Sequence, residues 1–222
     1  MRTGSLSSWL KSFYRTAPAT LIITAASIVL WFIAAFQAGS LTQVFGNSEL
    51  VHNMMVWGPA FEIAAHWWTP LSYAFMHLDI GHLTVNMIML MLIGREVERH
   101  FGTVLFVALY ISAAISSGLL ILTLDFMSPT AGASGALFAL MVLLISVYRS
   151  RGMDLRAPIV LVVVNVVYTF ISSGVSLWGH LGGLFAGIIL ALCVTRKSQV
   201  VHWLGLAGLP IATYVLYAST GI

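Results

Sequence analysis

The stretch GASGALFALMVLLISVY, residues 132–148, places a serine among glycines and alanines at the start of a mostly apolar run. As a helix, the part from Ser134 to Tyr148 would extend about 22 Å at 1.5 Å per residue. The hydrocarbon core of a bilayer is about 30 Å thick, so this helix is too short to cross it. We therefore expect the outer end of the helix, with Ser134, to lie below the membrane surface.

The composition of the whole chain is that of an integral membrane protein. Of the 222 residues, 59% are hydrophobic and only 8% are charged, and the mean hydropathy is +0.97. Soluble domains carry about 25% charged residues, so a soluble enzyme is excluded. No nucleic-acid partner is expected. The single cysteine, Cys193, lies in an apolar run, cannot form an intrachain disulfide and is expected to contribute to packing.

Apolar runs recur along the chain and predict seven membrane helices. These runs are 17–38, 82–101, 104–124, 134–148, 157–172, 178–194 and 200–218. The first run lacks the nearby small-residue cleavage site of a signal peptide, so we expect it to remain as a helix. The predicted fold class is therefore an all-α membrane protein, a polytopic helical bundle.

The basic residues all fall on one side of this predicted bundle. They are Arg2, Lys11, Arg15, Arg95, Arg99, Arg149, Arg151, Arg156, Arg196 and Lys197. Because short cytoplasmic loops are enriched in Lys and Arg, we expect this side and the N-terminus to be cytoplasmic. The opposite side carries the acidic residues Glu49, Glu62 and Asp125 and no basic residue.

Two connections on the outer side are unusual. The connection 39–68 carries Trp57, Trp67 and Trp68 among apolar residues, so we expect it to lie in or dip into the membrane interface. A loosely folded loop with aromatic anchors is the alternative. The segment LDFMSPTAGA before Ser134 is rich in turn residues, and non-helical backbone at that depth must be shielded by protein or line a wet cavity. Ser134 is therefore expected at the floor of a cavity.

Four polar side chains are expected at one depth near the outer ends of three helices. His82 and Asn86 are four residues apart on one helix face, whereas His180 and Ser134 begin two other helices. Such groups are costly in a bilayer and indicate a functional site.

The chemistry that fits these four residues is nucleophilic acyl transfer. A serine hydroxyl becomes a nucleophile when a histidine takes its proton, so Ser134 and His180 would react. No acidic residue is placed to orient the imidazole, which favours a dyad over a triad. Neutral His82, the Asn86 amide and backbone N–H groups at the helix start would stabilise the oxyanion.

These residues also have structural interpretations. Ser134 alone is more often a helix cap than a nucleophile, and His82 or Asn86 alone more often joins helices by hydrogen bonds. Gly179, Gly183 and Gly187, at intervals of four, predict a close helix approach under either interpretation.

A metal site is the competing use of the histidines. The sequence has no H-E-x-x-H motif, and His77 and His82 are five residues apart, which suits one helical face poorly. We therefore expect neither a metal nor another cofactor.

Taken together, the motifs resemble the rhomboid family of intramembrane serine proteases. The matching segments are GASG with Ser134, GHLGG with His180, HLDIGHLTVN with His77, His82 and Asn86, and GREVERHFG with Gly94, Glu98 and Gly102. The resemblance implies that Ser134 is the nucleophile and His180 the base, with His82 and Asn86 stabilising the oxyanion. It makes His77, Gly132 and Phe138 supporting residues, Phe138 by packing against the histidine. Thr69 departs from the pattern, because many members have arginine after this tryptophan.

The resemblance also implies a domain organisation and a function. Residues 1–16 would be a cytoplasmic segment, 17–195 a six-helix catalytic core and 196–222 an additional membrane helix. The substrates would be transmembrane segments of membrane proteins that enter laterally from the lipid bilayer. Segment 172–176, SSGVS, is expected to cover the site and to open. We expect a bacterial plasma membrane, with the active site on the extracytoplasmic side.

Two other functions compete with proteolysis. A catalytically inactive rhomboid-like protein would bind membrane proteins or act in their quality control without cutting them; the presence of both Ser134 and His180 argues against this. A small transporter would need charged or unwound sites near the midplane, whereas the polar cluster here is at the outer edge.

Overall fold

The computed structural model describes residues 6–172 and 174–221, and within them the regular structure is helical. The long elements are α1 (Leu6–Thr16), α2 (Pro18–Ala38), α7 (Ile80–Met89), the π-helical turn η2 (Leu90–Gly94), α8 (Arg95–Phe101), α9 (Thr103–Leu124), α10 (Ser134–Ser150), α11 (Arg156–Ile171), α12 (Leu177–Val194) and α13 (Gln199–Ser219). Short elements α3 (Val44–Asn47), α4 (Glu49–Met54), α5 (Gly58–Ile63), α6 (Thr69–Ser72) and η1 (Tyr73–Phe75) lie between α2 and α7.

The seven predicted apolar helices are confirmed. In the described part of the chain, five are long and apolar enough to cross a membrane: α2, the continuous α7–η2–α8, α9, α12 and α13. Two are shorter, α10 with 17 residues and α11 with 16. The protein is thus a polytopic all-α membrane protein, and α10 has the short length expected from its sequence.

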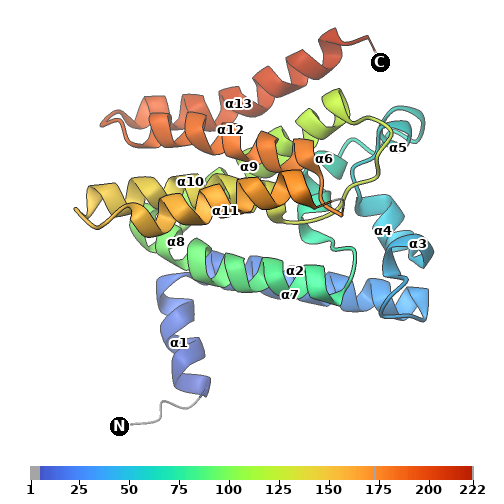
Figure 1. Ribbon diagram of the computed structural model, residues 1–222, viewed down its shortest axis with the longest axis horizontal. Coiled ribbons are helices and arrows are strands. Elements are labelled where there is room, and N and C mark those ends of the chain that lie inside the picture. The colour runs from blue at the N-terminus through green and yellow to red at the C-terminus, as the bar shows by residue number, and fades with distance from the viewer. Residues whose placement is uncertain (1–5, 173, 222) are drawn as a thin grey trace.

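The helices form a layered bundle around α10 (Figure 1). Helix α10 contacts α9, α11 and α12, which surround it, and also α8. Helix α13 packs against α9 and α12 at one side of the bundle, whereas α2 and α7 lie at the opposite side (Figure 1). This arrangement buries more than half of α10 and of α9, with ten of the 17 residues of α10 and twelve of the 22 residues of α9 buried.

The described basic residues gather at one end of the bundle. The α10–α11 and α12–α13 connections lie at the same end as α8 (Figure 1), and Arg151 bridges to Glu96 of α8 at 2.8 Å. This agrees with the charge pattern of the sequence, although Arg2 lies outside the described residues. The cytoplasmic location of this end stays a prediction.

Residues 6–16 form a helix, α1, that the sequence analysis did not predict. Phe13 is buried at its contact with α8, where the Arg95 guanidinium lies 5.0 Å from the ring centroid. Pro18 occupies the first turn of α2, where its missing N–H costs no helical hydrogen bond. Two helices therefore meet at Ala17 instead of one continuous helix.

Glu98 fixes the start of α2. Its side-chain oxygens accept hydrogen bonds from Ala19 N (2.9 Å), Thr20 N (2.8 Å), Thr20 Oγ1 (2.7 Å) and Thr103 Oγ1 (2.9 Å). The first N–H groups of a helix have no partner within it, and the helix dipole favours negative charge there. A Cβ on Gly94 would approach Thr20 at 3.1 Å, so the glycine allows this close contact. The GREVERHFG segment thus joins three helices.

The connection 39–68 is folded, so the alternative of a loosely folded loop is wrong. Three short helices span much of it, and Trp68 Nε1 donates to Asn53 O at 2.7 Å. Trp57 Nε1 donates to Met127 O at 3.2 Å. Val56 and Thr130 exchange two backbone hydrogen bonds of 2.9 Å. This connection therefore braces the segment that precedes Ser134.

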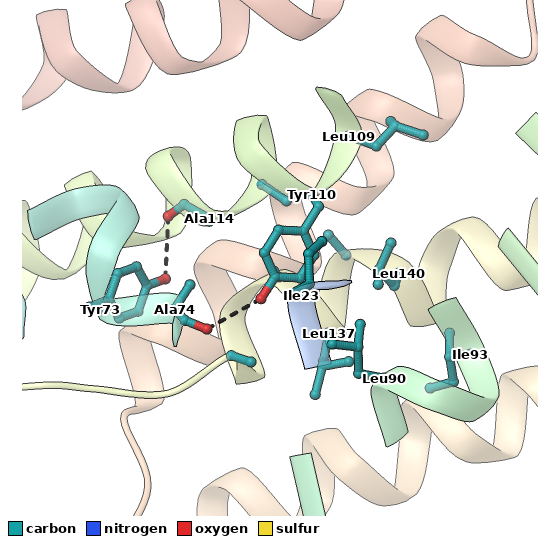
Figure 2. Close-up of a cluster of buried hydrophobic side chains, with 14 of the residues drawn as sticks. Ile23, Tyr73, Ala74, Leu90, Ile93, Leu109, Tyr110, Ala114, Leu137 and Leu140 are labelled. Atoms are coloured by element: carbon teal, nitrogen blue, oxygen red, sulfur yellow. Dashed lines mark hydrogen bonds between the residues drawn. The ribbon is translucent and has the colours of Figure 1, made fainter. Parts of the chain in front are cut away.

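Two buried tyrosines fasten η1 to α9 (Figure 2). Tyr73 donates to Ala114 O at 3.3 Å, and Tyr110 donates to Ala74 O at 3.2 Å. Both hydroxyls are therefore satisfied inside an apolar cluster. Because Tyr73 O also accepts from Gly132 N at 2.9 Å, the same anchor holds the backbone two residues before Ser134.

Candidate active site

Ser134 is the first residue of α10 and lines two adjoining cavities of about 380 and 350 Å³. Ala133 holds the N-cap position, and α10 has no side-chain capping hydrogen bond. The structure therefore does not support the capping interpretation of Ser134. The hydroxyl lies at a helix start, where the first N–H groups have no partner within the helix and negative charge is favoured.

His180 lies in the first turn of α12, which Ser176 caps by accepting from Gly179 N at 3.1 Å. The imidazole is buried and lines both cavities together with Ser134. The ring of Phe138 stacks on it, with centroids 4.4 Å apart and an interplanar angle of 21°. The stacking restricts the imidazole to one plane.

Glycines bring the helices of Ser134 and His180 into backbone contact. A Cβ on Gly183 would overlap the carbonyl of Gly135, and one on Gly187 would lie 2.7 Å from Ala139 Cα. These two glycines of α12 therefore face α10. Gly179 faces α9 instead, where its carbonyl accepts from Ser117 Oγ at 2.6 Å. The three glycines therefore allow α12 to approach two helices closely, α10 at Gly183 and Gly187 and α9 at Gly179.

His82 lies across Gly132 from Ser134. A Cβ on Gly132 would lie 2.8 Å from His82 Cε1, 3.1 Å from His82 Nε2 and 3.6 Å from Ser134 Oγ. Leu78 N donates to His82 Nδ1 at 3.4 Å, so Nδ1 is unprotonated and the neutral ring carries its proton on Nε2. The Nε2–H donor therefore lies on the side of the ring near Ser134.

Asn86 is buried beside this group and lines the second cavity. Its Nδ2 donates to His82 O at 2.9 Å within the same helix, and its buried Oδ1 has no partner. Because an amide has two N–H bonds, one donor remains for the cavity. The hydrogen bond of Asn86 is within α7, so it does not act here as a link between helices.

His77 supports the segment before Ser134. Its buried ring packs edge-on against His82, with centroids 5.2 Å apart, and its Nε2 accepts from Ala133 N at 3.4 Å. Burial, with a smaller contribution from His82, lowers the pKa of His77 to about 3. The neutral ring can therefore accept this backbone hydrogen bond. His77 lines neither cavity, whereas Phe138 lines the second one.

The sequence analysis missed Thr169, on α11. Its Oγ1 lies 2.8 Å from His180 Nδ1, so the imidazole has a hydroxyl as neighbour where a triad would have a carboxylate. The available signal was the spacing of Asn165 and Thr169, four residues apart on an otherwise apolar helix. The cavities also contain Asp125 and Asp79, neither of which bonds to His180.

The four predicted polar residues thus come together around the two cavities. In the described residues no hydrogen bond joins Ser134 to His180, and catalytic hydrogen bonds in resting enzymes are often long. Gly174, Val175 and Ser176 line the first cavity, so the predicted cover is partly in place. Ser173 lies outside the described residues, and opening of this segment stays a prediction.

The chain is similar in sequence to known proteins. The Rhomboid domain family matches residues 64–197, which include all seven predicted site residues. Rhomboid protease GluP of Bacillus subtilis is 30% identical over 181 residues, covering 78% of this chain and 34% of that protein. Rhomboid-related protein 3 of Homo sapiens is 22% identical, covering 89% and 54%. YdcA of Bacillus subtilis is 27% identical, covering 85% and 95%. The chain spans about a third and about half of the first two relatives.

Proposed function

This chain belongs to the rhomboid family, and we propose that it is an intramembrane serine endopeptidase that cleaves transmembrane segments of other membrane proteins. The observation that carries the proposal is the convergence of Ser134, His180 and His82, from three helices, on one cavity. Rhomboid protease GluP, among the relatives, is named as a protease. A family member that binds without cutting would not require this convergence.

In the proposed reaction, Ser134 Oγ attacks the carbonyl carbon of the scissile peptide bond. His180 Nε2 takes the hydroxyl proton as the new C–O bond forms, and later gives it to the leaving amine. Phe138 holds the imidazole plane during both transfers. Water then attacks the acyl-enzyme, with His180 again as base, and frees the second product.

The tetrahedral intermediate carries a negative charge on its oxygen. His82 Nε2–H, the free N–H of Asn86 and the backbone N–H groups at the start of α10 are the donors for this oxyanion. Preorganised donors in a site that excludes bulk water are each worth about 10²–10³ in rate. His82 acts in its neutral form, which its hydrogen bond from Leu78 N favours.

A substrate must lose helical structure before it can react. A peptide bond within a transmembrane helix is shielded by hydrogen bonds, and hydrocarbon offers no replacement for them. The cavity at Ser134 is lined by polar groups such as Ser128, Thr130 and Ser176, which can bond to an unwound segment. We therefore expect substrates with small or helix-breaking residues at the cleavage point.

Labelling by a fluorophosphonate probe tests the activated serine without knowledge of the substrate. The detergent-purified chain is compared with Ser134→Ala, His180→Ala and the control Ser146→Ala, which removes a hydroxyl near the other end of α10. We expect labelling of the native chain and the Ser146 variant only. A folded native chain that stays unlabelled, beside a serine protease labelled in parallel, would instead indicate the inactive type of family member.

A further inference from the structure

Most residues of helix α11 are exposed, yet one of its two buried residues is polar. Only Pro158 and Thr169 are buried among its 16 residues, and Thr169 is 5% exposed. Apolar neighbours such as Val164 and Phe170 are exposed. Thr169 is therefore one of two points at which a residue of α11 is buried against the bundle, and it lies at the edge of the His180 ring.

Two short contacts converge on the Thr169 hydroxyl. Its Oγ1 lies 2.8 Å from Asn165 O, one turn earlier in α11, and 2.8 Å from His180 Nδ1. A hydroxyl has one proton to donate and two lone pairs that accept. A carbonyl oxygen can only accept, so the hydroxyl proton must point to Asn165 O if that contact is a hydrogen bond.

The remaining contact then requires a proton on His180 Nδ1. If the hydroxyl instead donated to Nδ1, the oxygens of Thr169 and Asn165 would face each other at 2.8 Å without a proton between them. One arrangement alone gives both contacts a proton: Thr169 donates to Asn165 O, and His180 Nδ1–H donates to Thr169 Oγ1. In this tautomer Nε2 carries a free lone pair.

We propose that Thr169 is the positioning residue that fixes His180 in the Nδ1–H tautomer, so that Nε2 is free to take the proton of Ser134. The contact between Thr169 and His180 is independent of the proposed proteolytic function, whereas its effect on proton transfer from Ser134 rests on that function. Thr169 does for the imidazole what a carboxylate does in a triad, without placing a second charge in the membrane.

Thr169 and Phe138 restrict different motions of the same ring. Phe138 stacks on the face of the imidazole, whereas Thr169 contacts its edge at Nδ1. When Nε2 is protonated during the reaction, both nitrogens are donors, and the Thr169 lone pair continues to accept from Nδ1–H. The contact therefore stabilises the protonated base as well as the resting one.

Kinetic labelling tests the role through an isosteric change. Thr169→Val removes the hydroxyl and keeps the shape, Thr169→Ser keeps the hydroxyl, and Thr213→Val is the control. Thr213 makes the same type of hydrogen bond to the carbonyl four residues earlier, in α13. We expect Thr169→Val to slow fluorophosphonate labelling about 10- to 100-fold, the effect of one hydrogen bond to a charged group. Thr169→Ser should restore a near-native rate, and Thr213→Val should leave it unchanged.

The tautomer of His180 is a second quantity to measure, because it would not change in Thr169→Val if Thr169 had only a structural role. Nitrogen-15 NMR of histidine-labelled protein, with His180 assigned by its loss in His180→Gln, reports which nitrogen carries the proton. We expect Nδ1–H in the native chain and a mixture in Thr169→Val. Nε2–H in the native chain would overturn the proposal even if Thr169→Val failed to fold, as would an unchanged rate and tautomer in folded Thr169→Val.

Different results would contradict the proteolytic function and the positioning role of Thr169. A native chain that is never labelled but shows the Nδ1–H tautomer would contradict the proteolytic function and leave the Thr169 contact standing. A native chain that is labelled at a rate independent of the Thr169 hydroxyl would retain the function and remove the positioning role.

Discussion

Gly132 is the residue at which backbone conformation and site geometry meet. It has φ of +151°, and a Cβ there would lie 2.8 Å from the His82 ring. A side chain would strain the backbone and push His82 away from Ser134, and strain of this kind costs about 1–3 kcal/mol. The absence of a side chain at this position is therefore part of the proposed oxyanion site.

We predict that Gly132→Ala folds but loses most of its labelling by a fluorophosphonate. Gly46→Ala is the matched control, because a Cβ there meets nothing within 4 Å. Labelling rates and thermal melting of both variants give the comparison. Native-rate labelling of Gly132→Ala would show that His82 can shift without cost to the site.

His82 and Asn86 should differ in their contribution to the rate. His82→Ala removes the Nε2–H donor of the ring. In the described residues the side-chain hydrogen bond of His82 is at Nδ1, so Nε2–H is available to the oxyanion and we expect labelling to slow about 10²–10³-fold. Asn86→Ala should have a smaller effect, because one of its N–H bonds is already used by His82 O. Single-turnover labelling rates measure both. Equal losses would mean that the Asn86 amide reorients toward the oxyanion.

At the scale of elements, the start of α2 depends on one carboxyl group. Glu98→Gln replaces one of two accepting oxygens with a donor that faces the N–H groups of Ala19 and Thr20. Leaving such a donor unpaired costs about 1–3 kcal/mol. We predict a clear loss of unfolding free energy in mixed micelles.

Glu96→Gln is the control for Glu98→Gln on the same short helix. Glu96 pairs with Arg99 and Arg151 at the surface, where ion pairs are worth about 0–1 kcal/mol. Its loss should therefore change the unfolding free energy little. A larger effect at Glu96 than at Glu98 would contradict the capping role of Glu98.

The distance between helices α10 and α12 depends on the absence of a side chain at Gly183. Gly183→Ala would place a methyl group against the Gly135 carbonyl, and overpacking of this kind costs about 1–3 kcal/mol. Gly208→Ala, on α13 with open space around it, should be neutral or stabilising by up to about 1 kcal/mol. Melting temperatures that fall for Gly183→Ala alone would verify the contact; equal shifts would contradict it.

At the scale of the whole molecule, α13 lies outside the candidate site. Only Leu206 and Tyr217 of this helix are buried, and none of its residues lines the two cavities beside Ser134. It is joined to the rest by a hydrogen bond from Tyr217 to Glu62 and by close packing of Gly205 on Cys193. The division of the chain into a core of residues 17–195 and an addition of residues 196–222 stays a prediction.

We predict that a chain ending at Ser198 keeps fluorophosphonate labelling of Ser134 but melts at a lower temperature than the full chain. Removing α13 uncovers faces of α9 and α12 without changing the cavities. Labelling and melting in the same detergent give the two quantities. Loss of labelling in a chain that still melts cooperatively would make α13 part of the catalytic unit.

The amino-acid sequence by itself determined the class and the seven apolar helices, and it predicted a common depth for the polar residues. Run lengths predicted seven apolar helices, and the shortness of the run from Ser134 predicted its submerged start. The spacing of His82 and Asn86 predicted a shared helix face, which the structure has. These properties follow from hydropathy and from the fixed rise and turn of a helix, which act over a few neighbouring residues.

The tertiary structure alone decided which helix faces meet. Thr169 contacts His180 from another helix, and Gly183 meets Gly135 almost fifty residues away. The sequence spacing marks Thr169 and Gly183 as unusual, but it does not say which residue each of them meets. In a soluble protein an apolar stripe would mark the inward face, but lipid is as apolar as the protein core. Hydrophobicity therefore selects the helices of this protein and not their orientation. That orientation is fixed by the fit of small residues and by hydrogen bonds between helices, which only the packed molecule contains.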